Sequence, residues 1–170
     1  MTMVDDDVRS APTGSAGRER ALDWAGTLAR LILGGVLLIA GLLKVGHPGQ
    51  SARAVQAYQL LPFDVARLVG YGLPLVEIIV GSLLILGLLT RGAAVLGTML
   101  MLAFVIGISS AWARGLAIDC GCFGGGGQIE PAKTAYPLEL ARDSLFALCG
   151  AYLSWRPRSF LSLDRRWYGN

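Results

Sequence analysis

The sequence alternates between long apolar runs and shorter polar segments. Runs of about 18 or more apolar residues can cross the roughly 30 Å hydrocarbon core of a bilayer as helices, at about 1.5 Å of rise per residue. The fourth run is the shortest, because Arg142 and Asp143 interrupt its first turns. The pattern predicts an all-α integral membrane protein, a four-helix bundle in lipid. The predicted spans are about residues 24–45, 68–89, 93–113 and 138–155.

The polar segments divide the chain into a membrane domain and two tails. Residues 1–20 hold few large apolar side chains, so they cannot bury enough surface to offset the entropy of ordering, and we expect a disordered tail. Residues 21–155 form the four-span membrane domain, and residues 156–170 form a basic tail without a span. The longest connection, residues 114–137, lies between the third and fourth spans.

Two local patterns refine these elements. Ala54, Val55, Tyr58 and Leu61 recur at a spacing of three to four residues, which predicts a short helix lying in the membrane interface. The first span contains small residues that would let a neighbouring helix approach closely. These small residues are Gly34, Gly35 and Gly41.

The charges set the predicted topology. The formal net charge is only +3, which does not suggest nucleic-acid binding. Eight basic residues fall on the side of the two termini, against five on the opposite side, or six with Arg142. Positive residues favour the cytoplasm, so we expect a multi-pass protein of the cell membrane with both termini cytoplasmic and residues 114–137 extracytoplasmic. The eight are Arg9, Arg18, Arg20, Arg91, Arg156, Arg158, Arg165 and Arg166, and the five are Lys44, Arg53, Arg67, Arg114 and Lys133.

Two of the three cysteines lie one residue apart in the longest connection, as Cys120 and Cys122. A disulfide needs Cα atoms about 4.4–6.8 Å apart, which this spacing meets only with a bend that Gly121 permits. The ring would be small and strained, and such disulfides are the exchangeable kind. Asp119 should oppose thiolate formation, whereas Arg114 or Arg142 would favour it if either lies nearby. The spacing favours a redox pair.

Two other interpretations of the pair stay open. As soft ligands, Cys120 and Cys122 suit Cu(I) or zinc, but zinc takes about four ligands and the single histidine, His47, is in another loop. A permanent structural disulfide would stabilise little, because closing so small a loop removes little entropy. Cys149 falls about 16 Å into the fourth span and is expected to be a buried apolar residue.

Two charged positions inside the apolar runs are candidates for function. Glu77 falls near the bilayer midplane, where an ionisable residue is costly and needs a partner. It could relay protons for the dithiol, form an ion pair with Arg30 or Lys44, or be protonated and bonded to a carbonyl. Pro74 frees one such carbonyl, that of Gly70. Arg30 itself is close enough to the span's start to reach the headgroups.

Arg142 and its neighbour Asp143 are the second position. Because they are adjacent on a helix, we expect them to point in different directions. They would face the bundle or the outer headgroups, or else modify the pKa values of the cysteines.

Several strings in the chain resemble the DoxX-like superfamily, and more closely its MauE branch, the methylamine-utilisation membrane proteins. The resemblance covers about residues 24–155, and its most specific part is the CGCFG string before the final span. The matching strings are Ala40-Gly41-Leu42-Leu43-Lys44, Pro74-Leu75-Val76-Glu77 with Gly81, Gly87 and Arg91-Gly92, then Arg114-Gly115, and Cys120-Gly121-Cys122-Phe123-Gly124.

The resemblance implies a four-helix membrane protein associated with thiol redox chemistry. Proteins of the MauE branch are thought to support disulfide formation or maturation of an exported enzyme, together with a thioredoxin-like partner. By this comparison Cys120 and Cys122 would be the redox pair. Four charges match motif positions without a settled role. They are Lys44, Glu77, Arg91 and Arg142. DoxX-like relatives also include quinol-oxidase subunits, which lack a comparable thiol role.

The leading hypothesis is therefore a membrane thiol–disulfide oxidoreductase whose extracytoplasmic pair exchanges electrons with a thioredoxin-like protein. A metal-handling protein for copper or zinc, and a non-catalytic subunit or assembly factor, are the alternatives. The sequence carries no haem or quinone signature, so it identifies no cofactor. A quinone would be compatible with the membrane, but nothing in the sequence supports one. The partner, the direction of electron flow, the pathway and the oligomeric state stay open.

Overall fold

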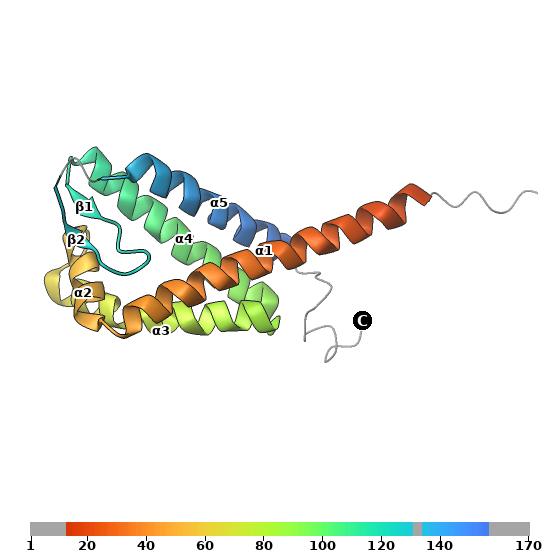
Figure 1. Cartoon of the computed structure of the whole chain (residues 1–170), viewed down its shortest axis with the longest axis horizontal. Coiled ribbons are helices and arrows are strands. Elements are labelled where there is room, and N and C mark those ends of the chain that lie inside the picture. The colour runs from red at the N-terminus through yellow and green to blue at the C-terminus, as the bar shows by residue number, and fades with distance from the viewer. Residues whose placement is uncertain (1–12, 131–133, 157–170) are drawn as a thin grey trace, which may run out of the picture.

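The computed structural model describes residues 13–130 and 134–156, which form five helices and one two-stranded sheet (Figure 1). The mostly helical structure confirms the predicted fold class. A small hairpin within the longest connection is the one addition to it. The elements are α1 (Thr13–Val45), α2 (Pro48–Ala57), α3 (Phe63–Leu86), α4 (Thr90–Ala113), β1 (Ile118–Asp119), β2 (Gly127–Gln128) and α5 (Tyr136–Trp155).

Within the described part of the chain, three helices are long and apolar enough to cross a membrane. They are the part of α1 from Gly17 to Val45, and the whole of α3 and α4. Exposed leucines, isoleucines and valines cover the outer faces of these helices, as lipid contact requires. The predicted fourth span is a helix, α5, but its first half carries Glu139, Arg142 and Asp143. That α5 crosses the membrane stays a prediction.

The first helix begins earlier than predicted. Residues 13–20, expected in a disordered tail, are the first turns of α1. Ala, Arg and Glu in this stretch are good helix formers. Glu19 also forms a 2.9 Å ion pair with Arg156, the residue that follows α5. Residues 1–12 and 157–170, the rest of the two predicted tails, lie outside the described residues.

Glycines let α1 and α3 pack closely. A Cβ on Gly81 would lie 2.6 Å from the Leu38 backbone nitrogen, and one on Gly41 would lie 2.7 Å from the Pro74 carbonyl oxygen. Gly34 also faces α3, whereas a Cβ on Gly35 would meet no atom of the described residues within 4 Å. The prediction for the first span thus holds at Gly34 and Gly41. The core between α1, α3, α4 and α5 is built from residues such as Leu33, Leu37, Val80, Leu84, Met101 and Leu153.

Arg30 lies inside this bundle and not at the headgroups. Its side chain is only 1% exposed. The prediction that it reaches back to the interface is wrong, because its position on α1 faces the neighbouring helices.

The carbonyl freed by Pro74 has a partner in α2. Ser51 Oγ donates a 2.7 Å hydrogen bond to the Gly70 carbonyl oxygen. Gly70 lets the two helices approach closely, because a side chain there would overlap the backbone of Ala52. The bond satisfies a polar group that lipid could not, and it fastens α2 to α3.

The hairpin and α2 lie together at one end of the molecule, opposite the turn between α3 and α4 (Figure 1). The strands pair antiparallel, with Ile118 opposite Gln128 and Asp119 opposite Gly127. The loop between the strands packs on α2. A Cβ on Gly121 would lie 2.7 Å from the Cβ of Ala54, and Gly126 sits against the same residue.

Candidate functional site

The cysteine pair occupies the loop of the β1–β2 hairpin. Gly121 between them has φ +67, and the glycines that follow also have positive φ, a region that side-chain-bearing residues rarely adopt. This backbone folds Cys122 back, so that its N–H donates a 3.3 Å hydrogen bond to Cys120 Sγ. Both cysteines are free thiols. Gly121 thus has the bent conformation that a Cys120–Cys122 disulfide would need.

Both cysteines are buried, although they lie in a glycine-rich loop. Cys120 is 7% exposed and Cys122 is 6% exposed. They belong to a second apolar cluster at the hairpin end of the bundle. Its other buried members are Tyr58, Ile108, Ala111, Ile118 and Tyr136.

Two tyrosines and one arginine fix the hairpin. Tyr58 at the end of α2 donates a 3.0 Å hydrogen bond to the carbonyl of Cys120. The Tyr136 hydroxyl accepts a 3.0 Å hydrogen bond from the Ile118 N–H and donates to the Leu116 carbonyl. Arg114 donates to the Tyr58 carbonyl, so of the two arginines considered above it is not the one beside the cysteines.

Cys120 is the thiol that the structure favours as a thiolate. A hydrogen bond from Cys122 is the main cause that lowers the pKa of Cys120, and Arg142 acts in the same direction. Arg142 Nη2 lies 3.9 Å from Cys120 Sγ. Burial and the nearby Glu139 oppose the shift, but the direction is downward.

Cys122 has the opposite environment. Its hydrogen bond to Cys120 raises its pKa, and burial and Asp143 raise it further. Its Sγ lies 3.7 Å from Asp143 Oδ2, close enough for the thiol to donate to the carboxylate. The two sulfurs are therefore unequal: one is stabilised as a thiolate, and the other keeps its proton beside a potential base.

Arg142 and Asp143 pair with each other, contrary to the prediction that they point apart. Arg142 Nε lies 2.9 Å from Asp143 Oδ1. The flexible arginine side chain bends back across the helix face, and its guanidinium also lies 4.8 Å from the centre of the Phe123 ring. Of the two settings proposed for this pair, the structure places it against the CGC loop.

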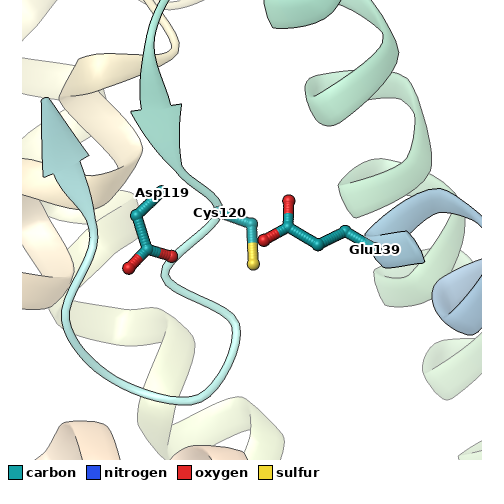
Figure 2. Close-up of side chains that lie close together, drawn as sticks. All are labelled: Asp119, Cys120 and Glu139. Carbon is teal, nitrogen blue, oxygen red and sulfur yellow. The ribbon is translucent and has the colours of Figure 1, made fainter. Parts of the chain in front are cut away.

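Asp119 and Glu139 lie near Cys120 and form with it a group of three potential metal ligands (Figure 2). One ligand atom each from Asp119, Cys120 and Glu139 lies within 4.8 Å of the others. Glu139 comes from the first turn of α5 and points toward Cys120. Asp119 is partly engaged, because its Oδ1 accepts a 3.1 Å hydrogen bond from the Gly121 N–H. Cys122, the second ligand expected from the sequence, is not in this group.

Glu77 pairs with Lys44 inside the bundle. Lys44 Nζ lies 2.6 Å from Glu77 Oε1, with the two side chains 3% and 0% exposed. Of the partners proposed for Glu77, the structure selects Lys44. The carboxylate also borders a small pocket that extends to Cys122 and Asp143, with room for about one water molecule.

The other predicted candidates lie elsewhere. Arg91 is exposed in the first turn of α4. This helix begins at the end of the bundle away from the hairpin (Figure 1). Cys149 packs against the first apolar core, but it is half-buried and not buried as predicted.

Three site residues were not assigned from the sequence. Glu139 carries a usable signal, because it lies four residues before Asp143 and therefore on the same face of a helix. Tyr58 was placed on an interfacial helix without a role. Nothing in the local pattern around Tyr136 points to its two hydrogen bonds with the hairpin.

Fold and site together define a membrane-spanning helical protein with a buried, unequal dithiol at one end. The family described as "Methylamine utilisation protein MauE" matches residues 22–156, and the chain belongs to this family. The methylamine utilization protein MauE of Paracoccus denitrificans is 34% identical over 98 residues, which are 57% of this chain. The match spans 53% of that protein, about half of its length. No solved structure matches. The resemblance noted in the sequence is confirmed.

Proposed function

We propose that this chain is a membrane thiol–disulfide exchange protein. In it, Cys120 attacks the disulfide of a partner protein, and Cys122 resolves the mixed disulfide that forms. The observation that carries the proposal is the inequality of the two sulfurs. Cys120 Sγ accepts from the Cys122 N–H and lies beside Arg142, whereas Cys122 faces Asp143. Exchange needs one thiolate that attacks the partner's disulfide and a second thiol that stays protonated until the mixed disulfide has formed.

Oxidation of the pair takes two successive thiolate attacks. The Cys120 thiolate attacks one sulfur of a partner's disulfide, forming a mixed disulfide and breaking the partner's S–S bond, which leaves the first partner thiolate. Cys122 then loses its proton and attacks Cys120 Sγ. The Cys120–Cys122 bond forms, the mixed disulfide breaks, and the second partner thiolate departs. The pair gives up two electrons and the partner's disulfide gains them. The reverse sequence reduces the pair.

The partner fits the class of exported thioredoxin-like proteins, and the hairpin end would face the extracytoplasmic side. Charge counting favours that side, and disulfides persist there. A partner sulfur can reach Cys120 only if the hairpin loop moves, because the residue is 7% exposed. A succession of positive-φ glycines from Gly124 to Gly127 gives the loop the backbone freedom to do so. By the name of the relative, methylamine utilisation is one setting for this chemistry, in support of disulfide formation or maturation of an exported protein.

Trapping the mixed disulfide tests the proposal. In cells, a Cys122→Ala variant should accumulate a covalent adduct of Cys120 with its partner, visible on a non-reducing gel and lost on reduction. Cys120→Ala should accumulate none, and Cys149→Ala, which alters a thiol outside the pair, should match the parent protein. Equal behaviour of all three variants would contradict exchange and favour a non-catalytic subunit.

The predicted side of the membrane needs its own measurement. A membrane-impermeant thiol reagent is added to intact cells whose protein retains only the Cys120–Cys122 pair, with and without reductant. Labelling that appears only after reduction supports an extracytoplasmic disulfide. Labelling that appears only after lysis contradicts the assigned topology.

Metal handling is the second candidate, favoured by the convergence of Asp119, Cys120 and Glu139. A thiolate with two carboxylates suits zinc better than Cu(I), which prefers sulfur ligands. The guanidinium 3.9 Å from Cys120 Sγ repels a cation, which ranks this function below exchange. Purified, reduced protein would hold stoichiometric zinc by elemental analysis, and Glu139→Gln would lose it while Cys122→Ala would keep it.

A further inference from the structure

A small pocket joins the intramembrane ion pair to the dithiol. It is lined by Glu77 of α3, by Cys122 and Phe123 of the hairpin, and by Asp143 of α5. Apolar side chains from α1 and α4 complete its wall, and the three polar groups that line it are all buried. Its size accommodates about one water molecule.

Only one of the two carboxylate oxygens of Glu77 takes part in the ion pair with Lys44. Its Oε1 contacts Lys44, but its Oε2 is buried and has no hydrogen-bond partner among the described residues. Glu77 is 0% exposed. A buried carboxylate oxygen without a partner is costly, and a water or a proton in the adjacent pocket would satisfy it.

Lys44 has a second partner, the aromatic ring of Phe104. Its Nζ lies 5.3 Å from the centre of the Phe104 ring, and Phe104 is one of the apolar residues that line the pocket. A cation over an aromatic face is stabilised without an anion. The Phe104 ring therefore gives the Lys44 ammonium group a partner in addition to Glu77.

Four elements supply the titratable groups around the pocket. α1 contributes Lys44 and α3 contributes Glu77. The hairpin contributes the Cys122 thiol, and α5 contributes Asp143 with Arg142 bonded to it. The pocket-lining residues of α4, Met101 and Phe104, do not titrate. Cys122 thus has one carboxylate at 3.7 Å and a second carboxylate across a one-water pocket.

From this arrangement, and resting on the proposed thiol–disulfide exchange, we propose that Asp143 and Glu77 receive the proton of Cys122. When Cys122 attacks the mixed disulfide at Cys120, its S–H proton passes to the Asp143 carboxylate and then, through a water in the pocket, to Glu77. One proton moves for each disulfide closed, and no electron passes through the carboxylates. In the reverse reaction, the same groups return the proton to the Cys122 sulfur. Arg142, 2.9 Å from Asp143 Oδ1, holds this carboxylate in position beside Cys122.

The two steps can be timed separately with dithiodipyridine as the oxidising probe. It releases one thiopyridone when Cys120 attacks it and a second when Cys122 resolves the adduct. The protein is the full chain in detergent with Cys149→Ala, so that only the pair reacts. In Glu77→Gln, which keeps the shape of the side chain, the first release should keep its rate. The second release should slow by about a hundredfold, the lower end of the effect of a positioned acid–base group.

The pH dependence separates proton handling from a structural role. In the parent protein the second release should fall as pH drops, because protonated carboxylates cannot accept. In Glu77→Gln that part of the profile should flatten. Asp143→Asn, which removes the nearer acceptor, should slow the second release as well. This variant provides the test if Glu77→Gln does not fold.

Each outcome bears on one proposal. A second release equally fast in the parent and in Glu77→Gln overturns the role of Glu77 alone, and exchange by the pair stands. Equal slowing of both releases overturns it as well, since it indicates a distorted site. A parent protein without any second release overturns the exchange function itself and this inference with it.

Discussion

Lys44 Nζ and Glu77 Oε1 lie 2.6 Å apart in the interior of the bundle, which joins the end of α1 to the middle of α3. The contact falls between two helices that glycines already hold close together. It also lies beside the pocket that reaches the dithiol. One ion pair therefore belongs both to helix packing and to the neighbourhood of the reactive sulfurs.

Removing one member of this pair should destabilise the protein more than removing both. Lys44→Met leaves Glu77 buried without its cation, and breaking a buried pair costs about 3–5 kcal/mol. The double variant Lys44→Met with Glu77→Gln removes both charges and should recover most of that loss. Unfolding in mixed detergent measures the free energies for a double-mutant cycle. Additive losses in the double variant would contradict an energetic coupling between the two residues.

The reactivity of Cys120 should follow pH in a predictable direction. Its lowered pKa means that the reactive thiolate persists below the ordinary value of 9.0 for a thiol. Alkylation by iodoacetamide should therefore reach half its maximal rate below pH 9.0 in a Cys149→Ala background. Cys122→Ala should move this midpoint upward, because it removes the largest cause of the shift, and Arg142→Gln should move it upward by less.

Cys122 should show the contrary behaviour. A Cys120→Ala variant removes the largest cause that raises the pKa of Cys122, but burial and Asp143 still raise it, so Cys122 should be alkylated slowly at neutral pH. Mass spectrometry of the alkylated peptide reports both rates. Faster labelling of Cys122 than of Cys120 at neutral pH would reverse the assignment of the attacking sulfur.

Undocking the hairpin loop should expose the cysteines. Gly126 has φ +89 and packs against Ala54, so Gly126→Ala would strain the backbone and push the loop from α2. Thiol labelling of the folded protein should then rise several-fold. Gly124→Ala is the matched control, since φ there is also positive, at +87, but the nearest atom to an added Cβ, in Leu43, is 3.7 Å away. Equal labelling in both variants would mean that strain, and not contact with α2, controls exposure.

An alanine substitution should disturb the close packing of α1 on α3 at one glycine but not at another. Gly81→Ala would place a Cβ 2.6 Å from the Leu38 nitrogen, and such overpacking costs about 1–3 kcal/mol. Gly35→Ala adds the same methyl group where the described residues leave space, and it should be neutral or slightly stabilising, because alanine favours helix. Thermal unfolding in detergent compares them. A larger loss of thermal stability in Gly35→Ala than in Gly81→Ala would mean that α1 contacts α3 through another face.

Much of the fold could be predicted from the sequence, because lipid imposes a simple pattern. Long apolar runs gave the three helices that are apolar enough to span a membrane, and Pro74 indicated that the Gly70 carbonyl needs an outside partner. The start of α1 was missed because its first turns are polar and carry no apolar periodicity. Their helix formation follows from residue propensity and from the ion pair between Glu19 and Arg156, which are far apart in the sequence.

The candidate site was predictable in its chemistry and less so in its geometry. The spacing of Cys120 and Cys122 indicated the thiol pair, and a charge near the midplane indicated that Glu77 has a partner. The burial of the pair could not be seen locally, because it comes from α2, α4 and α5 packing around a glycine-rich loop. The contact of Arg142 with Asp143 depends on a side-chain bend, which spacing on a helix does not determine.

The bond from Ser51 to the Gly70 carbonyl bears on whether the redox loop could work as an excised fragment. Through it α3 supports α2, and α2 supplies Ala54 and Tyr58 to the hairpin. α5 supplies the groups that make the two sulfurs unequal. A soluble peptide of residues 114–137 would keep both thiols but lose every one of these neighbours. Its cysteines should react like a pair of ordinary thiols, so the proposed exchange would need the whole bundle end and not the loop alone.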